Sequence, residues 1–90
     1  MLRADISPEA SKFISGLDFK RQSQILRKID QLCANPTSGD TRALVGFDFN
    51  RTRCEEYRII SRVKSGELQI ALIGRRHDNE VYHELKKLME

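Results

Sequence analysis

Apolar residues near the start of the chain recur with two different periods. Leu2, Ala4 and Ile6 alternate with polar residues, which predicts a half-buried strand. Ser7 and Pro8 then favour the start of a helix, because serine caps helices and proline suits the first helical position. The apolar residues that follow are spaced three and four apart, as on one side of a helix: Ala10, Phe13, Ile14 and Leu17.

A second helix is predicted after a break between Gly16 and Asp18, where Asp18 can act as its cap. It should end near Asn35, because Pro36 cannot continue a helix and residues 37–40 are typical of a loop. One side of this helix carries Gln22, Ile25, Leu26, Ile29, Leu32 and Cys33. The two amphipathic helices would form a helical hairpin, which needs another surface to cover its apolar side.

The second half of the chain supplies that surface as a set of strands. A short strand is predicted over Arg42–Phe47, a longer one over Arg53–Val63, and an apolar central one over Leu68–Ile73. Ser65 and Gly66 indicate a tight reversal between the last two. A short C-terminal helix follows, with Asp78 as its cap and apolar residues at Val81, Leu85, Leu88 and Met89.

These elements give the order β-α-α-β-β-β-α and predict an α+β fold. We expect a twisted, mainly antiparallel sheet with the helical hairpin on one face and a short C-terminal helix. The 90 residues fit one domain, residues 1–90, with no linker, repeat or low-complexity stretch.

Composition narrows the class of protein. Apolar residues make up 39% of the chain and charged residues 32%, which is the balance of a globular protein. No apolar run is long enough to cross a membrane, and the N-terminal residues do not resemble a signal peptide. Cys33 and Cys54 fit neither a disulfide framework nor a metal-binding spacing. We therefore expect a cytoplasmic protein with reduced, structural cysteines.

The positive charge is concentrated in one segment. The chain carries a net charge of +3, and residues 42–77 alone carry about +4, from eight basic and four acidic residues. Seven of these eight basic residues are arginines, whose planar guanidinium groups suit phosphate oxygens. Such a segment favours nucleic acid or an acidic protein as partner, although a mixed-charge soluble surface explains the composition equally well.

Alternation along the strand predicted at 53–63 gives the first candidate site residues. Glu56, Arg58 and Arg62 are two or four residues apart and should share one face. Arg51 and Arg53 have the opposite parity, so a bulge or loop at residues 54–56 is needed to bring them to Arg58. An ion pair between Arg58 and Glu56 on the surface is the competing interpretation.

The second group of candidates follows the predicted central strand. Arg75, Arg76 and His77 come directly after Gly74, at a strand end where loops hold side chains on a rigid support. They can meet a polyanion, and histidine can exchange protons near neutral pH. Tyr82 and His83 follow in the predicted C-terminal helix. An ordinary basic loop, a core tyrosine and a solvated histidine remain open as alternatives.

Four short sequences, in this order and spacing, resemble the RelE/ParE toxin superfamily of toxin–antitoxin systems. That family carries a Leu-x-Gly strand, an Asp-Tyr-Arg-Ile-Ile-Tyr-like strand, an Ile-Gly-His-Arg-like strand end and a closing Val-Tyr. The matching segments here are Leu44-Val45-Gly46-Phe47, Glu56-Tyr57-Arg58-Ile59-Ile60, Ile73-Gly74-Arg75-Arg76-His77 and Glu80-Val81-Tyr82. The resemblance extends over nearly the whole chain, from Leu2 to Leu88.

The resemblance implies a RelE-like fold and a toxin neutralised by a cognate antitoxin protein. In the RelE-like branch the toxin is an endoribonuclease that cleaves mRNA on the ribosome and so inhibits translation. The 2′-hydroxyl of the RNA attacks the adjacent phosphate, and no metal or cofactor is needed. The expected partners are therefore an antitoxin, mRNA and ribosomal RNA.

The resemblance also implies roles for individual residues. Arg58 matches a strand arginine that contacts the scissile phosphate, and Arg76 matches an arginine that stabilises the charged transition state. Tyr82 matches a tyrosine that transfers a proton or stacks on a base. Arg51 and Arg53 fall where some members carry lysines that serve the phosphate and proton transfer.

Arginine at these two positions is a departure from the family pattern. A guanidinium stays protonated at neutral pH, so the general acid or base must come from another residue. His77 is the first choice because it adjoins Arg76, with His83, Glu56 and Tyr82 as alternatives. Arg75 and His83 join Arg51 and Arg53 as expected RNA-binding residues.

Two other functions remain compatible with the sequence. A ParE-like toxin has the same fold but inhibits gyrase, and it would not need Arg76 and Tyr82. A non-catalytic binding module or degraded toxin is the third possibility, which the replacement of lysine by arginine keeps open.

Overall fold

The computed structural model describes residues 1–75 and 86–87, and residues 1–75 form two helices and five strands. In chain order these elements are β1 (Arg3–Ile6), α1 (Pro8–Ser15), α2 (Phe19–Ala34), β2 (Thr41–Ala43), β3 (Asn50–Cys54), β4 (Tyr57–Lys64) and β5 (Glu67–Arg75). The strands form one sheet in the order β1-β5-β4-β3-β2. β1 runs parallel to β5, and the other neighbours are antiparallel. The predicted α+β class is confirmed.

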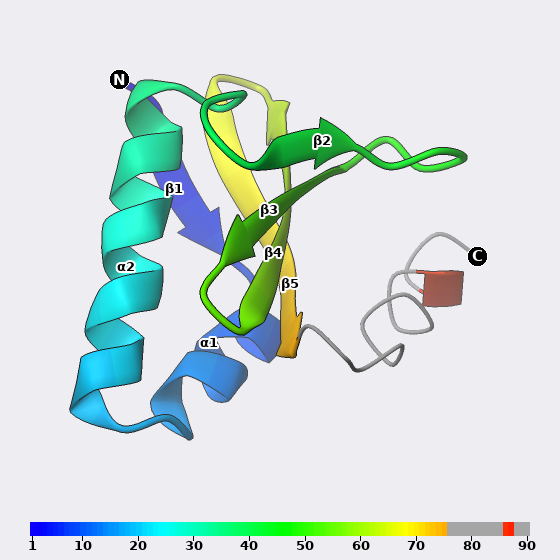
Figure 1. The fold of residues 1–90 in the computed structure, drawn as a ribbon. Coiled ribbons are helices and arrows are strands. Elements are labelled where there is room, and N and C mark those ends of the chain that lie inside the picture. The colour runs from blue at the N-terminus through cyan, green and yellow to red at the C-terminus, as the bar shows by residue number, and fades with distance from the viewer. Residues whose placement is uncertain (76–85, 88–90) are drawn as a thin grey trace.

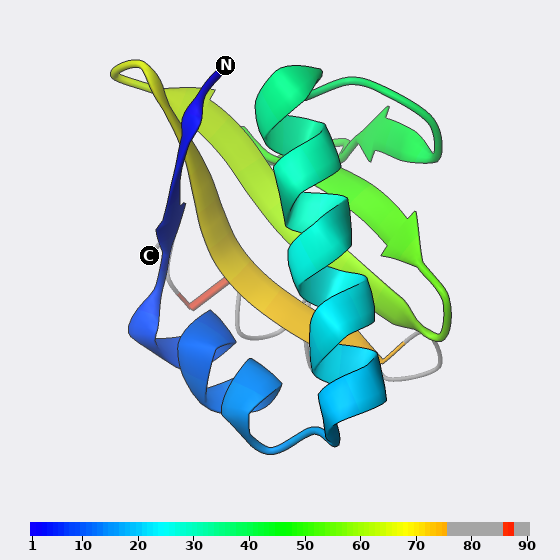
Figure 2. The same ribbon diagram turned by 90° about the vertical axis from the view of Figure 1, so that its left-hand side faces the viewer.

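Both helices begin at the caps that the sequence predicts. The Ser7 hydroxyl accepts a hydrogen bond from the Ala10 amide at 3.1 Å, and the Asp18 carboxylate accepts one from the Arg21 amide at 2.9 Å. The two helices lie on the same face of the sheet, and α2 crosses it along its length (Figure 1; Figure 2). We call this the helix-side face and the opposite one the far face.

The main core lies between the helices and the helix-side face. Ile25 and Leu32 of α2 are fully buried, and Ala10 and Ile14 of α1 are buried beside them. The sheet contributes Cys54, Tyr57, Ile59, Leu68, Ile70 and Ile73. These contacts hold β3, β4 and β5 as a rigid support for side chains on the far face.

A smaller apolar cluster lies on the far face. Ile60 of β4 is opposite Leu72 of β5, and both are buried together with Phe49. Leu44 and Phe47 of the loop before β3 contact this cluster. The sheet therefore has apolar contacts on both faces, and β5 lies inside the sheet between β1 and β4, as its apolar sequence predicts.

The prediction of one strand over residues 53–63 is wrong, because this stretch contains parts of two strands. β3 ends at Cys54 and β4 begins at Tyr57, with a two-residue turn between them. Glu55 has a φ of 54° in this turn, a conformation that usually favours glycine or asparagine. Because no such residue marks the turn, alternation alone could not detect it. The sheet accordingly has five strands, one more than the sequence predicts.

Three further predictions for the second half of the chain can be compared with the structure. The strand predicted over Arg42–Phe47 ends already at Ala43, and the chain turns through Gly46, whose φ is 84°. The reversal at Ser65 and Gly66 is confirmed, with φ values of 56° and 76°. Of the predicted C-terminal helix, residues 86 and 87 are helical and the other positions lie outside the described residues.

Candidate functional site

The β3–β4 hairpin brings two of the predicted site residues together. Arg53 lies directly opposite Arg58 in the antiparallel register. Side chains that are directly opposed point to the same face, with Cβ atoms about 4.5–5.5 Å apart. Tyr57 and Ile59 belong to the helix-side core, so alternation directs Arg58 to the far face. The turn at residues 54–56 is thus the loop that the sequence required for convergence.

A second pair of arginines lies next to the first on the far face. Arg51 is opposite Arg42 on one side and opposite Ile60 on the other. Arg51 and Arg58 are half-buried, whereas Arg42 and Arg53 are exposed. Like charges directly opposite each other destabilise a sheet, and a bound anion relieves that repulsion. We call these four residues the arginine rows.

Arg75 does not belong to the arginine rows. It lies opposite Tyr57 at the end of β5, and this register directs it to the helix-side face. Together with Asp18, Arg21 and Glu56 it lines a hollow of about 330 Å³ at the base of the helical hairpin. The register therefore separates Arg75 from Arg58, and its predicted contact with RNA stays a prediction.

Glu56 is held by a residue that the sequence analysis did not consider. Its carboxylate accepts a hydrogen bond from Arg21 Nε at 3.0 Å, and Arg21 also pairs with Asp18. The hydrogen bond from Arg21, followed by one from Tyr57, lowers the pKa of Glu56. A carboxyl group with a lowered pKa is a poor proton donor near neutral pH, which argues against Glu56 as the general acid.

The Arg21–Glu56 contact gives a direct prediction for acid titration. We expect an NMR titration to place the Glu56 pKa below the ordinary value of a glutamate, and Arg21→Gln to raise it towards that ordinary value. Because the folded-state pKa is depressed, the contribution of this pair to stability is present above the unfolded-state pKa. It is lost as the pH falls through the folded-state value. An unchanged Glu56 titration in Arg21→Gln would contradict this assignment.

Arg62 lies on the far face. The sequence predicted only that it shares a face with Arg58. Its guanidinium carbon lies 4.6 Å from the centre of the Phe49 ring, and its Nε donates to Gln69 Oε1 at 2.9 Å. Asp48 lies 3.9 Å from Nη1. The two-residue alternation from Arg58 placed Arg62 on this face, but nothing in the sequence signalled the stacking on Phe49.

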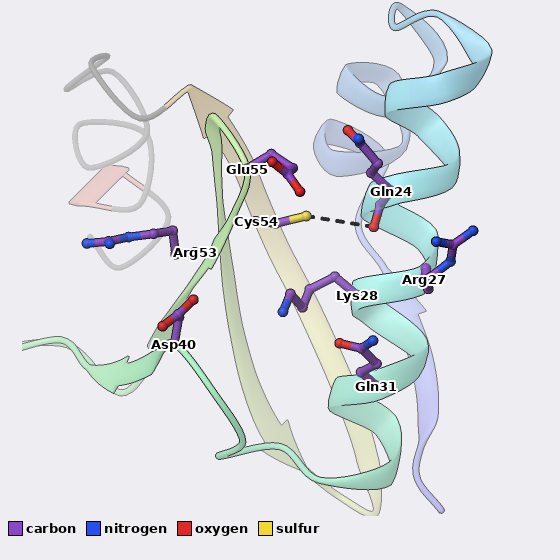
Figure 3. Close-up of a pocket in the computed structure, with 8 residues that line it drawn as sticks. All are labelled: Gln24, Arg27, Lys28, Gln31, Asp40, Arg53, Cys54 and Glu55. Atoms are coloured by element: carbon purple, nitrogen blue, oxygen red, sulfur yellow. Dashed lines mark hydrogen bonds between the residues drawn. The ribbon is translucent and has the colours of Figure 1, made fainter.

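A separate hollow of about 390 Å³ lies between α2 and the β3–β4 turn (Figure 3). Its lining mixes both charges, including Lys28 and Arg27 from α2 and Asp40 and Glu55 from the strand side. Arg53 also borders it, but its side chain points away from α2 (Figure 3). The hollow is therefore distinct from the arginine rows.

The two cysteines are buried in the core and are not reactive groups. Both are buried and free, and burial raises the pKa of each thiol, so neither is a reactive thiolate at neutral pH. Cys54 Sγ is 3.7 Å from the Gln24 carbonyl oxygen across the core (Figure 3). Within residues 1–75 and 86–87, no group of three histidine, cysteine or acidic residues is arranged to hold a metal ion.

The remaining predicted site residues lie outside the part of the chain that the structure describes. They are Arg76, His77, Tyr82 and His83. Arg76 follows directly on Arg75, the last residue of β5. Among the described residues, Arg51, Arg53 and Arg58 are brought to one face. In the same part of the chain, no helix is long and apolar enough to cross a bilayer.

Comparison with known proteins identifies the fold. No family model matches the sequence, and no curated protein matches it. Among solved structures, a mutant of the E. coli toxin RelE in the free state matches with a TM-score of 0.82 and 18% identity, over 99% of this chain and 98% of that one. A chain of the archaeal RelE–RelB complex from Pyrococcus horikoshii matches with a TM-score of 0.75 and 24% identity, over 84% of this chain and 96% of that one.

The chromosomal ParDE toxin–antitoxin system of P. aeruginosa also matches, with a TM-score of 0.73 and 18% identity, over 83% of this chain and 96% of that one. At these identities the similarity establishes the fold. The RelE-like fold that the sequence resemblance implied is thus confirmed.

Proposed function

We propose that this chain is the toxin of a toxin–antitoxin pair and that it cleaves mRNA on the ribosome. The observation that carries the proposal is the register of the β3–β4 hairpin, which sets Arg53 opposite Arg58 beside Arg51 on the far face. The similarity to RelE, both free and in complexes with RelB, supports the choice of toxin class. The concentration of arginine supports an RNA substrate, whose phosphates dominate binding.

The proposed reaction is a metal-independent transesterification. The 2′-oxygen of one nucleotide attacks the adjacent phosphorus, the bond to the 5′-oxygen breaks, and a 2′,3′-cyclic phosphate and a 5′-hydroxyl result. One proton leaves the 2′-hydroxyl and one reaches the 5′-oxygen. The enzyme must hold the attacking oxygen in line, stabilise the extra negative charge and handle these two protons.

Each proposed residue serves one of these tasks. Arg58 contacts the scissile phosphate from its half-buried position on β4. Arg76 stabilises the charge that develops in the transition state, and His77 is the proposed proton-transfer residue, with Tyr82 as the other. Arg51 and Arg53 bind neighbouring phosphates. Their fixed charge suits binding and excludes proton shuttling at neutral pH.

Arg76 gives the experiment that tests the proposal as a whole. Expression of the chain without its antitoxin should arrest growth and produce new mRNA 5′ ends. Arg76→Ala should lower the rate of mRNA cleavage by about a hundredfold or more, and growth should then continue. Arg27→Ala, an exposed α2 residue on the helix side, is the matched control. Equal cleavage by the wild-type chain and Arg76→Ala would remove Arg76 from the mechanism.

The structural similarity to the ParDE system makes gyrase inhibition the second candidate function. A ParE-like toxin would act on gyrase instead of mRNA, and its fold would be the same. The expected signature is then a DNA-damage response without new mRNA ends. Expression that neither slows growth nor cleaves mRNA would instead indicate a non-catalytic binding module.

The proposed partner protein is an antitoxin that covers the basic surface. An acidic or amphipathic segment lying over the arginine rows would neutralise their charge and block access to RNA. A matching antitoxin should form a stable complex whose affinity falls with salt, because the paired charges are screened. Co-purification at low and high ionic strength measures this dependence.

A further inference from the structure

The strand β1 (Arg3–Ile6) forms one edge of the sheet, and within residues 1–75 its only neighbouring strand is β5. Arg3, Ala4 and Asp5 are exposed, and Ile6 is half-buried. In Figure 2, β1 lies to one side of α2, which crosses the neighbouring strands. An edge strand presents unpaired backbone N–H and C=O groups to which another strand can bind. The side of β1 that faces away from β5 is therefore a surface on which a further strand can pair.

The backbone of β1 directs alternate residues towards this free edge. The Ser7 amide donates to the Ile70 carbonyl of β5 at 2.9 Å. Bonding to the neighbouring strand alternates along a parallel ladder, so residues 3 and 5 also bond β5. Ala4 and Ile6 then direct their N–H and C=O groups away from β5. These two residues supply the donors and acceptors of the free edge.

The side chains that flank Ala4 on β1 carry opposite charges. Ala4 is opposite Leu68, which belongs to the helix-side core, so alternation places its two neighbours on the far face. These neighbours are Arg3 and Asp5. Arg3 is opposite Glu67 on β5, yet neither Arg3 nor Asp5 forms a salt bridge with another residue in the described part of the chain. The edge therefore carries one cation and one anion, two residues apart on the same face.

We propose that β1 pairs with β1 of a second copy of this chain, in an antiparallel arrangement centred on Ala4. Ala4 then exchanges both backbone hydrogen bonds with Ala4 of the copy, and each Ile6 amide donates to a Leu2 carbonyl. The Leu2 amide is already bonded to the Cys33 carbonyl at 2.9 Å, so the ladder ends at this residue. The contact is short, and its backbone bonds alone do not distinguish a second copy from another strand.

The charges select both the partner and the register. With Ala4 at the centre, Arg3 lies opposite Asp5 of the copy, and Asp5 lies opposite Arg3 of the copy. Directly opposed side chains of unlike charge stabilise a sheet, and those of like charge destabilise it. A register centred on Arg3 or on Asp5 would set that residue against its own copy, with like charges opposed. The segment 3–5 is thus complementary to itself in the register centred on Ala4.

The pairing joins two sheets into one and leaves the arginine rows open. β1 and β2 are opposite edges of the sheet, and the arginine rows lie on β2, β3 and β4. The two-fold axis of the β1 pair is perpendicular to the sheet, so both far faces lie on the same side of the dimer. Dimerisation through β1 does not depend on RNA cleavage, because none of its residues belongs to the arginine rows.

Sedimentation of the purified chain from about 1 µM to about 1 mM tests the dimer, since so short a ladder gives only weak association. We expect a reversible change from monomer to dimer. Arg3→Asp leaves two carboxylates on the edge and Asp5→Arg leaves two guanidinium groups, so each variant alone should raise the dissociation constant about tenfold or more. An equimolar mixture of the two variants should recover dimerisation, because unlike charges again oppose each other.

Arg27→Asp and Asp30→Arg make the same charge changes on the exposed side of α2 and should dimerise like the wild-type chain. A wild-type chain that stays monomeric at about 1 mM would overturn the proposal. So would single variants that dimerise unchanged, or a mixture that stays monomeric although both variants are folded. If the antitoxin protects the Ala4 and Ile6 amides from hydrogen exchange while the free chain is a monomer, the edge binds a strand of the antitoxin, and pairing with a second copy is overturned.

Discussion

Replacement of Arg58 by alanine is expected to lower mRNA cleavage by about 10²–10³-fold, the loss that follows removal of one group stabilising a transition-state charge. Arg58 is half-buried on β4, and its neighbours Tyr57 and Ile59 are fixed in the core, so a rigid strand holds its guanidinium for the proposed contact with RNA. The rate of transcript cleavage in a purified translation system measures the effect.

Two further variants of the far face distinguish charge from geometry. Arg58→Lys keeps the charge but loses the planar fork, so we expect its activity to lie between those of the wild-type chain and Arg58→Ala. Arg53→Ala removes the opposed arginine and should mainly weaken RNA binding, with a shallower dependence on salt. If Arg58→Ala cleaves as fast as the wild-type chain, Arg58 does not contact the scissile phosphate.

The helices could be predicted from the sequence because their signals are local. Ser7 and Asp18 are caps that accept hydrogen bonds from the first turn, and Pro36 forbids continuation of α2. The apolar period then identifies most of the buried side of α2, although Leu26, which it places on that side, is 45% exposed. Ile25 and Leu32 are fully buried, as this period requires.

The β3–β4 turn could not be predicted, and this changes how the site is assembled. Glu55 adopts a positive φ without being glycine, asparagine or aspartate, so the sequence reads as one continuous strand. On a continuous strand Arg53 and Arg58 have opposite parity. The turn reverses the chain and sets Arg53 opposite Arg58. From the sequence alone, such a turn was only a condition that had to be met for the two arginines to come together.

Interactions between distant elements account for the rest of what the sequence did not reveal. Arg21 and Glu56 are 35 residues apart, and their pairing depends on how α2 crosses the sheet. The side on which Arg75 lies depends on its register with Tyr57, which includes a bulge between Ile60 and Ser61. Alternation within one strand cannot supply either fact.

The support beneath the arginine rows can be tested by a core substitution in α2. Leu32 is fully buried against the helix-side face, so Leu32→Ala should lower the free energy of unfolding by about 2–5 kcal/mol. The loss combines the transfer of the removed atoms with the cavity that they leave. Leu26→Ala, where the residue is 45% exposed on the same helix, should cost under about 1 kcal/mol. Urea unfolding followed by circular dichroism measures both values.

Because Leu32 and Arg58 lie on opposite faces of one sheet, stability and cleavage should respond separately. Leu32→Ala should lower the fraction of folded chain while each folded molecule cleaves mRNA at nearly the wild-type rate. Arg58→Ala should do the reverse, since removal of a far-face side chain leaves the helix-side core intact. Leu32→Ala could instead remain fully folded and still lose as much of the mRNA cleavage rate as Arg58→Ala does. In that case the helices would contribute to the site itself, and the far face alone would not be sufficient for activity.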